Sequence, residues 1–520
     1  MATVQLLDCT LRDGGYCNEW KFGFHNIVTI IDNLVQAGTE IIECGYLHEK
    51  VEGDSDRSLF CQISDLEKVL PSSKGESKVV CMINFGQYNI DNLPERSKTS
   101  IDGIRLAFHK KDREKALEEC KKIKEKGYLL FMQPMVTLNY SDVEFIQLIE
   151  DANIVEPYAF YIVDSFGSMK QKQLLHLFYM VEKNLSDSVI IGFHGHNNLQ
   201  LALSNAQVLT GMQTNRELLI DSSVFGMGRG AGNLNTELFM EHLNCSCGKS
   251  YKIDFVLKTI DEILNRFYEE NYWGYSLANY LSGTYNIHPN YASFLEEKNK
   301  LTLQNISDIF ALMDSDKKWE FDKEYIKDIY LEYLGKGLED SDKLIKSWQG
   351  KEILIIGPGR SAEVEREKVC QFAREHSVIA FSLNFIYSYL DVDYIFVSNV
   401  RRYHEMKQKP YQKLIVTSNI DDSKVQHRLD YTMLMNDFEL IADNAGMMLL
   451  KYLVDSKAKK IWLAGIDGYS YNMDDNYINN DMTINIRKCD IKQMNSEMKK
   501  LISNLSEYAE IEFLTTSILQ

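Results

Sequence analysis

Short apolar runs alternate with helical segments over the first 240 residues of the chain. Each run combines apolar and β-branched residues over about six positions and stops at glycine or polar residues. This is the pattern of a strand that is buried on both faces of a parallel sheet. The runs lie at residues 4–9, 40–45, 78–84, 103–108, 128–134, 159–164, 189–194 and 218–223.

The segments between these runs have the period of amphipathic helices. In residues 26–37, Ile27, Ile30 and Leu34 share one face, and Gly38 follows where a left-handed helix cap is expected. Eight consecutive β/α units predict an α/β fold, a closed (β/α)8 TIM barrel over residues 1–240, with its site at the carboxyl ends of the strands. An open doubly wound sheet is the structural alternative.

The next hundred residues read as helical. Residues 255–268, 306–312 and 325–334 are amphipathic, so we interpret residues 241–340 as a helical extension of the barrel. The charged, glycine-flanked residues 335–350 are interpreted as a linker.

A second α/β domain is predicted over residues 351–520. It begins with a strand, a tight glycine turn and a helix, which is typical of an open Rossmann-like sheet. Gly357 and Gly359 in this turn can approach a nucleotide phosphate, but G-P-G differs from the dinucleotide motif G-x-G-x-x-G, and a structural turn is the alternative. Further strands are expected at residues 378–384, 392–398, 413–418, 460–465 and 510–515.

Composition narrows the class of protein. The chain has 520 residues, too many for one core, and a formal net charge of −18, which argues against a nucleic-acid binder. The 10 cysteines form no regular framework, so we expect reduced thiols and a cytoplasmic protein. We see no signal peptide and no apolar run long enough to span a membrane, and we expect a homo-oligomer.

Two strand ends carry residues suited to metal chemistry. The first strand runs into LDCTLRDGGY, which places Arg12 and Asp13 directly after it, and the seventh ends in HGHNN with His194 and His196. Residues two apart on a strand share a face, so both imidazoles can join the Asp13 carboxylate in a three-ligand metal site with open positions. The alternatives are an Arg12–Asp13 pair and structural histidines.

Other strand ends and one loop add candidate substrate contacts. The loop GMGRGAGN, residues 226–233, is rich enough in glycine for backbone amides to approach an anion, although such loops often only turn a chain. Polar residues lie at or near four further strand ends and are candidate substrate-binding groups: Glu43, Arg105, Gln133 and Asp164.

Together these three motifs resemble the metal-dependent lyases and aldolases on a TIM barrel, the DRE-TIM metallolyases. That family includes 4-hydroxy-2-oxovalerate aldolase, HMG-CoA lyase and 2-isopropylmalate synthase. The resemblance implies that Asp13, His194 and His196 bind a divalent metal, Mn²⁺ or Mg²⁺ with Co²⁺ or Zn²⁺ as alternatives. It also implies that Asn233 is a further ligand and that Arg12 stabilises an enolate.

The sequence is most similar to the 4-hydroxy-2-oxovalerate aldolases within that family. Their acid/base histidine is replaced here by Tyr16, and a tyrosine beyond the barrel also belongs to their site. The segment SGTYNIHPNYASF offers Tyr285, with His288 as the acid/base candidate by its ordinary pKa and a structural histidine as the alternative.

The expected function is therefore a carbon–carbon lyase, a metal-dependent aldolase that acts on a 4-hydroxy-2-oxo acid and yields pyruvate and an aldehyde. The alternatives are an acyl-CoA lyase or Claisen synthase of the same fold, a scaffold with an idle barrel, and a glycosyltransferase with an auxiliary barrel. The last is raised by LIIGPGRSA, DNAGMMLLKYL and IWLAGIDGY, which resemble the nucleotide-binding half of bacterial sialyltransferases and surface-glycan accessory proteins. That resemblance implies a nucleotide or nucleotide-sugar ligand and a role in surface-sugar biosynthesis.

Overall fold

Eight parallel strands close into a barrel at the start of the chain. Their order is β1-β9-β8-β7-β6-β5-β4-β2, and β1 also pairs with β2, which closes the cylinder. The predicted TIM barrel is confirmed. The strands are β1 Thr3–Asp8, β2 Ile41–Leu47, β4 Lys78–Asn84, β5 Gly103–Phe108, β6 Leu129–Pro134, β7 Ala159–Asp164, β8 Ile190–Gly195 and β9 Glu217–Ser222, with the two-residue β3 Leu59–Phe60 beside β2.

This computed structural model describes residues 3–51, 54–298, 301–335, 347–478 and 490–520. It divides into two compact units, one of Met1–Ser293 with Asp314–Phe321 and one of Phe294–Met313 with Asp322–Gln520. The division falls within α12, Pro289–Glu297, whereas the domain boundaries expected from the sequence stay predictions. The predicted linker, residues 335–350, lies mostly outside the described residues.

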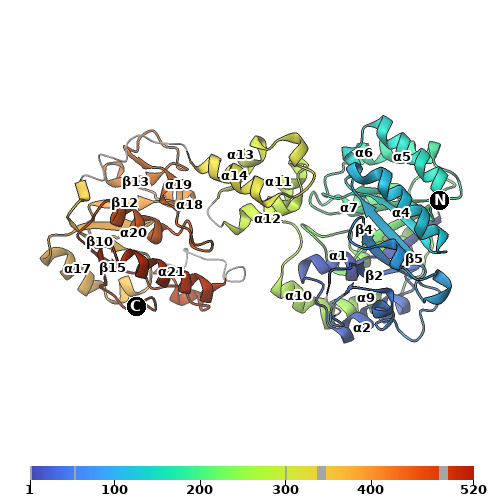
Figure 1. The fold of residues 1–520 in the computed structure, drawn as a ribbon, viewed down its shortest axis with the longest axis horizontal. Helices are drawn as coiled ribbons and strands as arrows, with labels where there is room; N and C mark the ends of the chain where they lie inside the picture. The colour runs from blue at the N-terminus through green and yellow to red at the C-terminus, as the bar shows by residue number, and fades with distance from the viewer. Residues whose placement is uncertain (1–2, 52–53, 299–300, 336–346, 479–489) are drawn as a thin grey trace. The chain divides into compact units, whose positions relative to one another are not determined.

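Helices cover the outside of the barrel. Figure 1 shows β4 and β5 inside a helical layer, with α5 and α6 on one side and α2 and α9 on the other. Gly38 adopts a left-handed conformation, φ 87°, and ends α2 as its pattern predicts. Two short 3-10 turns connect β4 to β5 instead of a long helix. The covering helices are α2 Phe24–Ala37, α4 Arg113–Glu125, α5 Asp142–Val155, α6 Gln171–Asn184, α7 Ala202–Thr210, α8 Thr236–Cys247 and α9 Ile253–Thr259.

Apolar side chains fill two layers of the barrel unit. The larger cluster lies between strands and helices, and a smaller one fills the inside of the barrel with residues such as Leu7, Phe131 and Leu219. This interior packing leaves the carboxyl end of the barrel to polar residues, and the candidate site lies there.

The segment after the barrel is helical, as predicted. A π-helical turn, Ile260–Leu264, separates α9 from α10, Asn265–Glu270, so the expected helix over residues 255–268 is interrupted. The following helices are α11 Leu277–Tyr285, α12, α13 Leu303–Leu312 and α14 Lys323–Leu334.

The second unit contains a parallel sheet in the order β14-β13-β12-β11-β10-β15-β16. The order reverses between β10 and β15, which is the feature of a doubly wound, Rossmann-like sheet. The predicted second α/β domain is therefore present. Its strands are β10 Glu352–Ile356, β11 Ile379–Leu383, β12 Tyr394–Val397, β13 Leu414–Thr417, β14 His427–Leu429, β15 Lys460–Ala464 and β16 Glu510–Phe513, and its longer helices are α17 Arg366–Glu375, α20 Ala445–Asp455 and α21 Ile491–Leu505.

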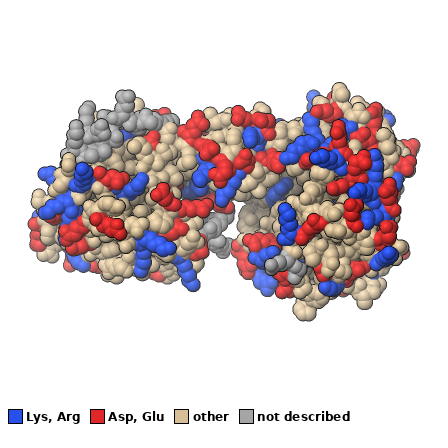
Figure 2. All heavy atoms as spheres, in the orientation of Figure 1, with Lys and Arg blue, Asp and Glu red and all other residues tan. Residues whose placement is uncertain are grey.

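The surface carries charges of both signs. Figure 2 shows acidic and basic side chains interleaved over the visible face of each unit. Among the helices in the described part of the chain, none is both long enough and apolar enough to cross a bilayer.

Candidate active site

The end of β1 holds Arg12 and Asp13 in a short helical turn, α1 Thr10–Asp13, and both side chains are buried. The glycines that follow are required by packing. A methyl group at Gly15 would overlap the ring of Trp20, and that ring donates a hydrogen bond from Nε1 to the Arg12 carbonyl at 2.8 Å. The sequence R-D-G-G therefore brings the chain back over the strand end and fixes both charged residues at the barrel mouth.

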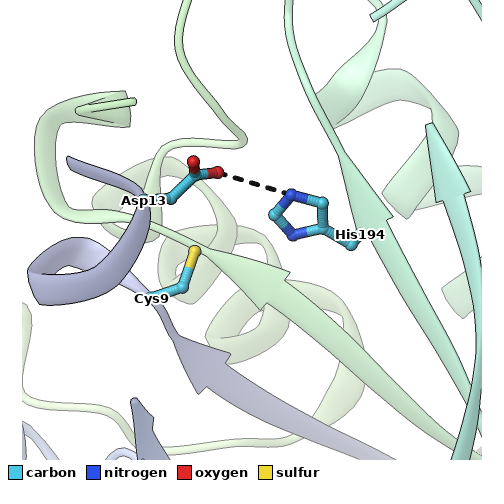
Figure 3. Close-up of side chains that lie close together, drawn as sticks. All are labelled: Cys9, Asp13 and His194. Atoms are coloured by element: carbon cyan, nitrogen blue, oxygen red, sulfur yellow. Dashed lines mark ion pairs between the residues drawn. The ribbon is translucent and has the colours of Figure 1, made fainter. Parts of the chain in front are cut away.

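Two imidazoles from β8 and the residue after it meet the Asp13 carboxylate. His194 Nε2 and His196 Nε2 lie 3.4 and 3.5 Å from Asp13 Oδ2, and the two nitrogens are 3.4 Å apart. Figure 3 shows the Asp13 carboxylate and the His194 ring facing each other above Cys9. Ligand atoms about 2.1 Å from one ion are separated by about this distance, so the three atoms have the spacing of a metal site. The structure thus brings together the three predicted ligands.

A closed ring of six ionisable side chains includes Asp13 and His194 of this cluster. Its members come from five strands or the turns that directly follow them, and all are buried. Three carboxylates alternate around the ring with two guanidinium groups and one imidazole. The closest approaches in order are Arg12 Nε–Glu43 Oε2 2.8 Å, Glu43 Oε2–Arg105 Nη1 2.7 Å, Arg105 Nη2–Asp221 Oδ2, Asp221 Oδ2–His194 Nδ1 2.9 Å, His194 Nε2–Asp13 Oδ2 3.4 Å and Asp13 Oδ1–Arg12 Nη1 3.2 Å.

The ring sets the protonation of the cluster. Burial opposes ionisation of Asp13, but Arg12 and the imidazoles outweigh it and hold the pKa of this carboxyl well below its usual range. Burial also lowers the pKa of His194, yet hydrogen bonds to Asp13 and Asp221 prevail, and the pKa is raised. For His196 burial dominates and lowers the pKa to about 3, so this imidazole is neutral at physiological pH.

These residues fit a divalent cation. With a neutral His194, the ring sets three carboxylates against two guanidinium groups, a buried excess of one negative charge. Asp13 Oδ2 and His196 Nδ1 are buried without a hydrogen-bond partner in the described chain, as is Asn233 Oδ1. A buried lone pair without a partner is costly, and a bound cation removes that cost for the two oxygens.

Cys9 is a further group near the cluster that the sequence reading overlooked. Its Sγ, a carboxylate oxygen of Asp13 and a ring nitrogen of His194 all lie within 4.8 Å of one another. Burial raises the pKa of the Cys9 thiol well above its usual range, and the thiol donates a hydrogen bond to the Ser222 carbonyl at 3.2 Å. The protonated thiol is a poorer ligand than the imidazoles.

Asn233 lies beside His196, because these two residues pair as an antiparallel bridge. The glycine loop makes this possible, since a methyl group at Gly228 would overlap the Asn233 amide. The predicted further ligand is thus adjacent to the cluster.

The four predicted substrate-binding residues have different surroundings. Glu43 and Arg105 are members of the ring, and Gln133 Nε2 is buried without a hydrogen-bond partner in the described residues. Both oxygens of Asp164 accept backbone N–H groups, from Ser168 at 2.9 Å and Met169 at 3.0 Å. Asp164 therefore holds its own loop, and burial raises its pKa to about 6.

The predicted acid/base residues lie in two places. The Tyr16 hydroxyl is 3.2 Å from that of Tyr46, and the side chain is 40% exposed. His288 is partly buried, and its Nε2 is 3.3 Å from Arg229 Nη1. Tyr285 ends α11 three residues before His288, and its role stays a prediction.

In the second unit, both glycines of the G-P-G turn pack against β15. Gly357 N–H donates to the Ala464 carbonyl and Gly359 N–H to the Gly465 carbonyl. The Asp467 carboxylate accepts from the Ser361 N–H at 2.7 Å, where a phosphate is expected in a nucleotide site. Both amides are thus already bonded, and a nucleotide at Gly357 and Gly359 stays a prediction.

The chain is thus a TIM-barrel protein with a buried Asp-His-His cluster at the carboxyl ends of its strands, where TIM-barrel enzymes have their active sites. The HMGL-like family model matches residues 3–262, half of the chain, and the chain belongs to this family. This membership confirms two predictions made from the three motifs: the relationship to the DRE-TIM metallolyases and the lyase class.

Individual relatives are about a quarter identical to the barrel over the aligned residues. A 4-hydroxy-2-oxovalerate aldolase of Geobacillus genomosp. 3 is 27% identical over 250 residues, which cover 46% of this chain and 70% of the relative. The enzyme of the same name from Pseudoalteromonas translucida is 28% identical over 246 residues, 45% of this chain and 68% of the relative. The crystal structure of the Bacillus subtilis HMG-CoA lyase is 16% identical, covers 51% of this chain and 93% of its own, and has a TM-score of 0.42.

Asp221 and Arg229 are two site residues that the sequence reading missed. A signal existed for Asp221, since a carboxylate within the apolar run 218–223 needs a buried partner. Arg229 lies in the glycine-rich loop, residues 226–233, and the glycine pattern carries no signal for this side chain.

Proposed function

We propose that the barrel unit is a divalent-metal-dependent aldolase acting on a 4-hydroxy-2-oxo acid, with pyruvate and an aldehyde as the products of cleavage. The observation that carries this proposal is the meeting of Asp13 Oδ2, His194 Nε2 and His196 Nε2 within 3.5 Å of one another, directly beside the Arg12 guanidinium. The names of the curated relatives support the choice of substrate.

Asp13, His194 and His196 would hold the cation, with Asn233 Oδ1 as a further ligand. One carboxylate, two imidazoles and an amide oxygen suit Mn²⁺ or Mg²⁺, and also Co²⁺ or Zn²⁺. When bound, the cation would act as a Lewis acid toward the keto oxygen of the substrate.

Arg12 supplies the positive charge for the oxyanion. Its Nε is bonded to Glu43 and its Nη1 faces Asp13, while its Nη2 has no hydrogen-bond partner within the described chain. A guanidinium held by two carboxylates is fixed in place before the reaction, so Nη2 can donate to a developing enolate oxygen without reorganisation.

The reaction balances with one proton carried by the protein. The 4-hydroxyl gives up its proton, the C3–C4 bond breaks, and its electron pair forms the enolate of pyruvate as the aldehyde leaves. Protonation at C3 then gives pyruvate. We assign the proton transfer to Tyr16 as a relay: its oxygen accepts the substrate proton as its own proton passes to solvent at the exposed mouth, where the hydroxyl lies beside Tyr46 and three residues after Asp13.

His288 has a different part in this scheme. Burial, followed by the charge of Arg229, lowers its pKa well below the usual range, so the ring is neutral. Its Nε2 lies 3.3 Å from Arg229 Nη1, in a hydrogen bond in which the guanidinium donates. His288 therefore positions Arg229 rather than carrying the proton of the reaction.

The test is pyruvate release by the full chain. Metal is removed with EDTA, Mn²⁺ or Mg²⁺ is restored, and pyruvate from 4-hydroxy-2-oxovalerate is measured with lactate dehydrogenase. We expect metal-dependent release that His196→Ala abolishes together with metal content, while His176→Ala, at an exposed side chain of α6, keeps both. A metal-loaded chain that cleaved 3-hydroxy-3-methylglutaryl-CoA but released no pyruvate would contradict the aldolase function and favour an acyl-CoA lyase.

A glycosyltransferase activity has its own readout, nucleotide released from a nucleotide-sugar by the full chain. The role in surface-sugar biosynthesis stays a prediction.

A further inference from the structure

Arg229 lies at the mouth of the barrel, beside the cluster but outside the charged ring. It belongs to the glycine loop between β9 and α8, four residues before Asn233. Its guanidinium carbon is 5.3 Å from the centre of the Tyr16 ring, and its Nη1 is 3.3 Å from His288 Nε2. The side chain thus joins the proposed proton-transfer residue to the segment that follows the barrel.

This guanidinium has no counter-charge in the described part of the chain. No Asp or Glu carboxylate among those residues forms an ion pair with Arg229, and its buried Nε has no hydrogen-bond partner there. Glu320, which acts electrostatically on nearby His109, is paired with Lys111 at 2.5 Å. By contrast, Arg12 and Arg105 each contact two carboxylates.

The groups around Arg229 do not neutralise its charge. Burial is the main cause that lowers the pKa of the three imidazoles of His109, His196 and His288, and the charge of Arg229 lowers it further. Keeping a partly buried cation among these rings without an acid is unfavourable unless an anion completes the site.

The contact between Arg229 and His288 satisfies one N–H group of the guanidinium but not its charge. Arg229 Nη1 donates to His288 Nε2 at 3.3 Å, and a neutral imidazole carries no negative charge to balance the cation. The buried Nε of Arg229 and its positive charge therefore stay without a partner in the described chain. This arrangement matches the oxygens of a carboxylate or a phosphate, which accept from several N–H groups at once.

We propose that Arg229, positioned by its hydrogen bond to His288 Nε2, binds an anionic group on the aldehyde half of the substrate. The inference rests on the proposed aldolase function and specifies its substrate class: aldehydes that carry a carboxylate or phosphate at the end remote from the reacting carbon. Arg12 stabilises the enolate of the pyruvate half. The two arginines therefore contact opposite ends of the 4-hydroxy-2-oxo acid.

Anion binding is measured first, because it needs no turnover. The full chain, as purified and after EDTA treatment, is titrated calorimetrically with inorganic phosphate and with malonate. We expect binding that Arg229→Gln weakens by about 10- to 100-fold, the range for hydrogen bonds to charged groups, and that Arg229→Lys weakens less. The matched control is Arg266→Gln on α10, which removes an exposed arginine of the same unit. The better ligand distinguishes phosphate from carboxylate.

Turnover then tests specificity. Aldol addition of pyruvate is followed with acetaldehyde, succinic semialdehyde and glyceraldehyde 3-phosphate. In the natural protein we expect a higher kcat/KM for at least one anionic aldehyde, and Arg229→Gln should lower the ratio of anionic to neutral kcat/KM by about 10- to 100-fold.

The two proposals fail in different ways. Equal anion affinity in the natural protein and Arg229→Gln, or no affinity in either, overturns the anion site. An unchanged ratio of kcat/KM overturns its role in specificity. Arg229-dependent anion binding by a chain that uses no aldehyde and releases no pyruvate overturns the aldolase function while the anion site stands.

Discussion

Nδ1 of His194 lies 2.9 Å from Oδ2 of Asp221, and this contact leaves Nε2 of the same ring facing Asp13. Asp221 is held in turn by Arg105 and by the Tyr161 hydroxyl, which donates to Oδ1 at 2.9 Å. The last strand of the barrel therefore orients a side chain that the proposed metal site needs, and the hydrogen bond selects the tautomer with a free Nε2 lone pair.

Replacing Asp221 by Asn should weaken metal binding without removing a ligand. The amide no longer stabilises the Nδ1–H tautomer of His194, so we expect the metal affinity to fall by about 10- to 100-fold, the usual effect of a lost partner behind a ligand. Calorimetric titration with Mn²⁺ or Co²⁺ measures this. Asp187→Asn, at a fully exposed carboxylate, is the control. Unchanged affinity in Asp221→Asn would show that His194 is not oriented by this contact.

Metal affinity should fall as the pH decreases through the raised pKa of His194. A proton competes with the metal for this ring below that pKa, which lies above 6.5, whereas His196 with a pKa of about 3 and Asp13 with a lowered pKa stay unprotonated. One competing proton gives a loss of about tenfold per pH unit. Titrations between pH 5 and 8 check the slope, and a loss of about a hundredfold per unit would mean that both imidazoles titrate.

Arg12→Lys should retain the metal and lose turnover. The lysine keeps the positive charge between Asp13 and Glu43 but lacks Nη2, the donor assigned to the enolate oxygen. We expect kcat to fall by about 100-fold, as for the removal of one oxyanion donor, with unchanged metal content by elemental analysis. Arg266→Lys is the control. Normal turnover in Arg12→Lys would exclude the oxyanion role.

Gly45→Ala should destabilise the barrel. Gly45 has φ 142°, and a methyl group there would overlap the Ser58 carbonyl, which is backbone and cannot rotate away. We expect a loss of about 1–3 kcal/mol in the free energy of unfolding, seen as a lower melting temperature of the full chain. Gly211→Ala is the control, because the nearest atoms would lie at 3.4 and 3.6 Å in ordinary helical backbone. Equal melting temperatures for the two variants would contradict this account.

The sequence pattern predicts the barrel well for a physical reason. Each main strand is buried on both faces and forms a largely apolar run, so all eight runs coincide with observed strands within about two residues. The pattern missed β3 and β14, which have two and three residues. Strands this short depend on a neighbour already in place and leave no periodic signal of their own.

The candidate site also contains residues that the sequence predicts and residues that it does not. Asp13, His194 and His196 are predictable because each directly follows or ends a strand, where a TIM barrel collects polar groups. The roles of Arg105 and Asp221 are not, because both lie inside apolar runs and their partners come from distant strands. Tyr16 and Arg229 meet only through the folding of two loops, which no local pattern encodes.

The charged ring also constrains when the candidate site can assemble during synthesis on the ribosome. Its first member is residue 12 and its last is residue 221, on strands that pair only when the cylinder closes. A nascent chain that ends before β9 holds Arg105 and His194 without their shared carboxylate. We therefore expect the proposed metal site to bind a cation only weakly until the last barrel strand has emerged, which would make metal loading a late event of synthesis.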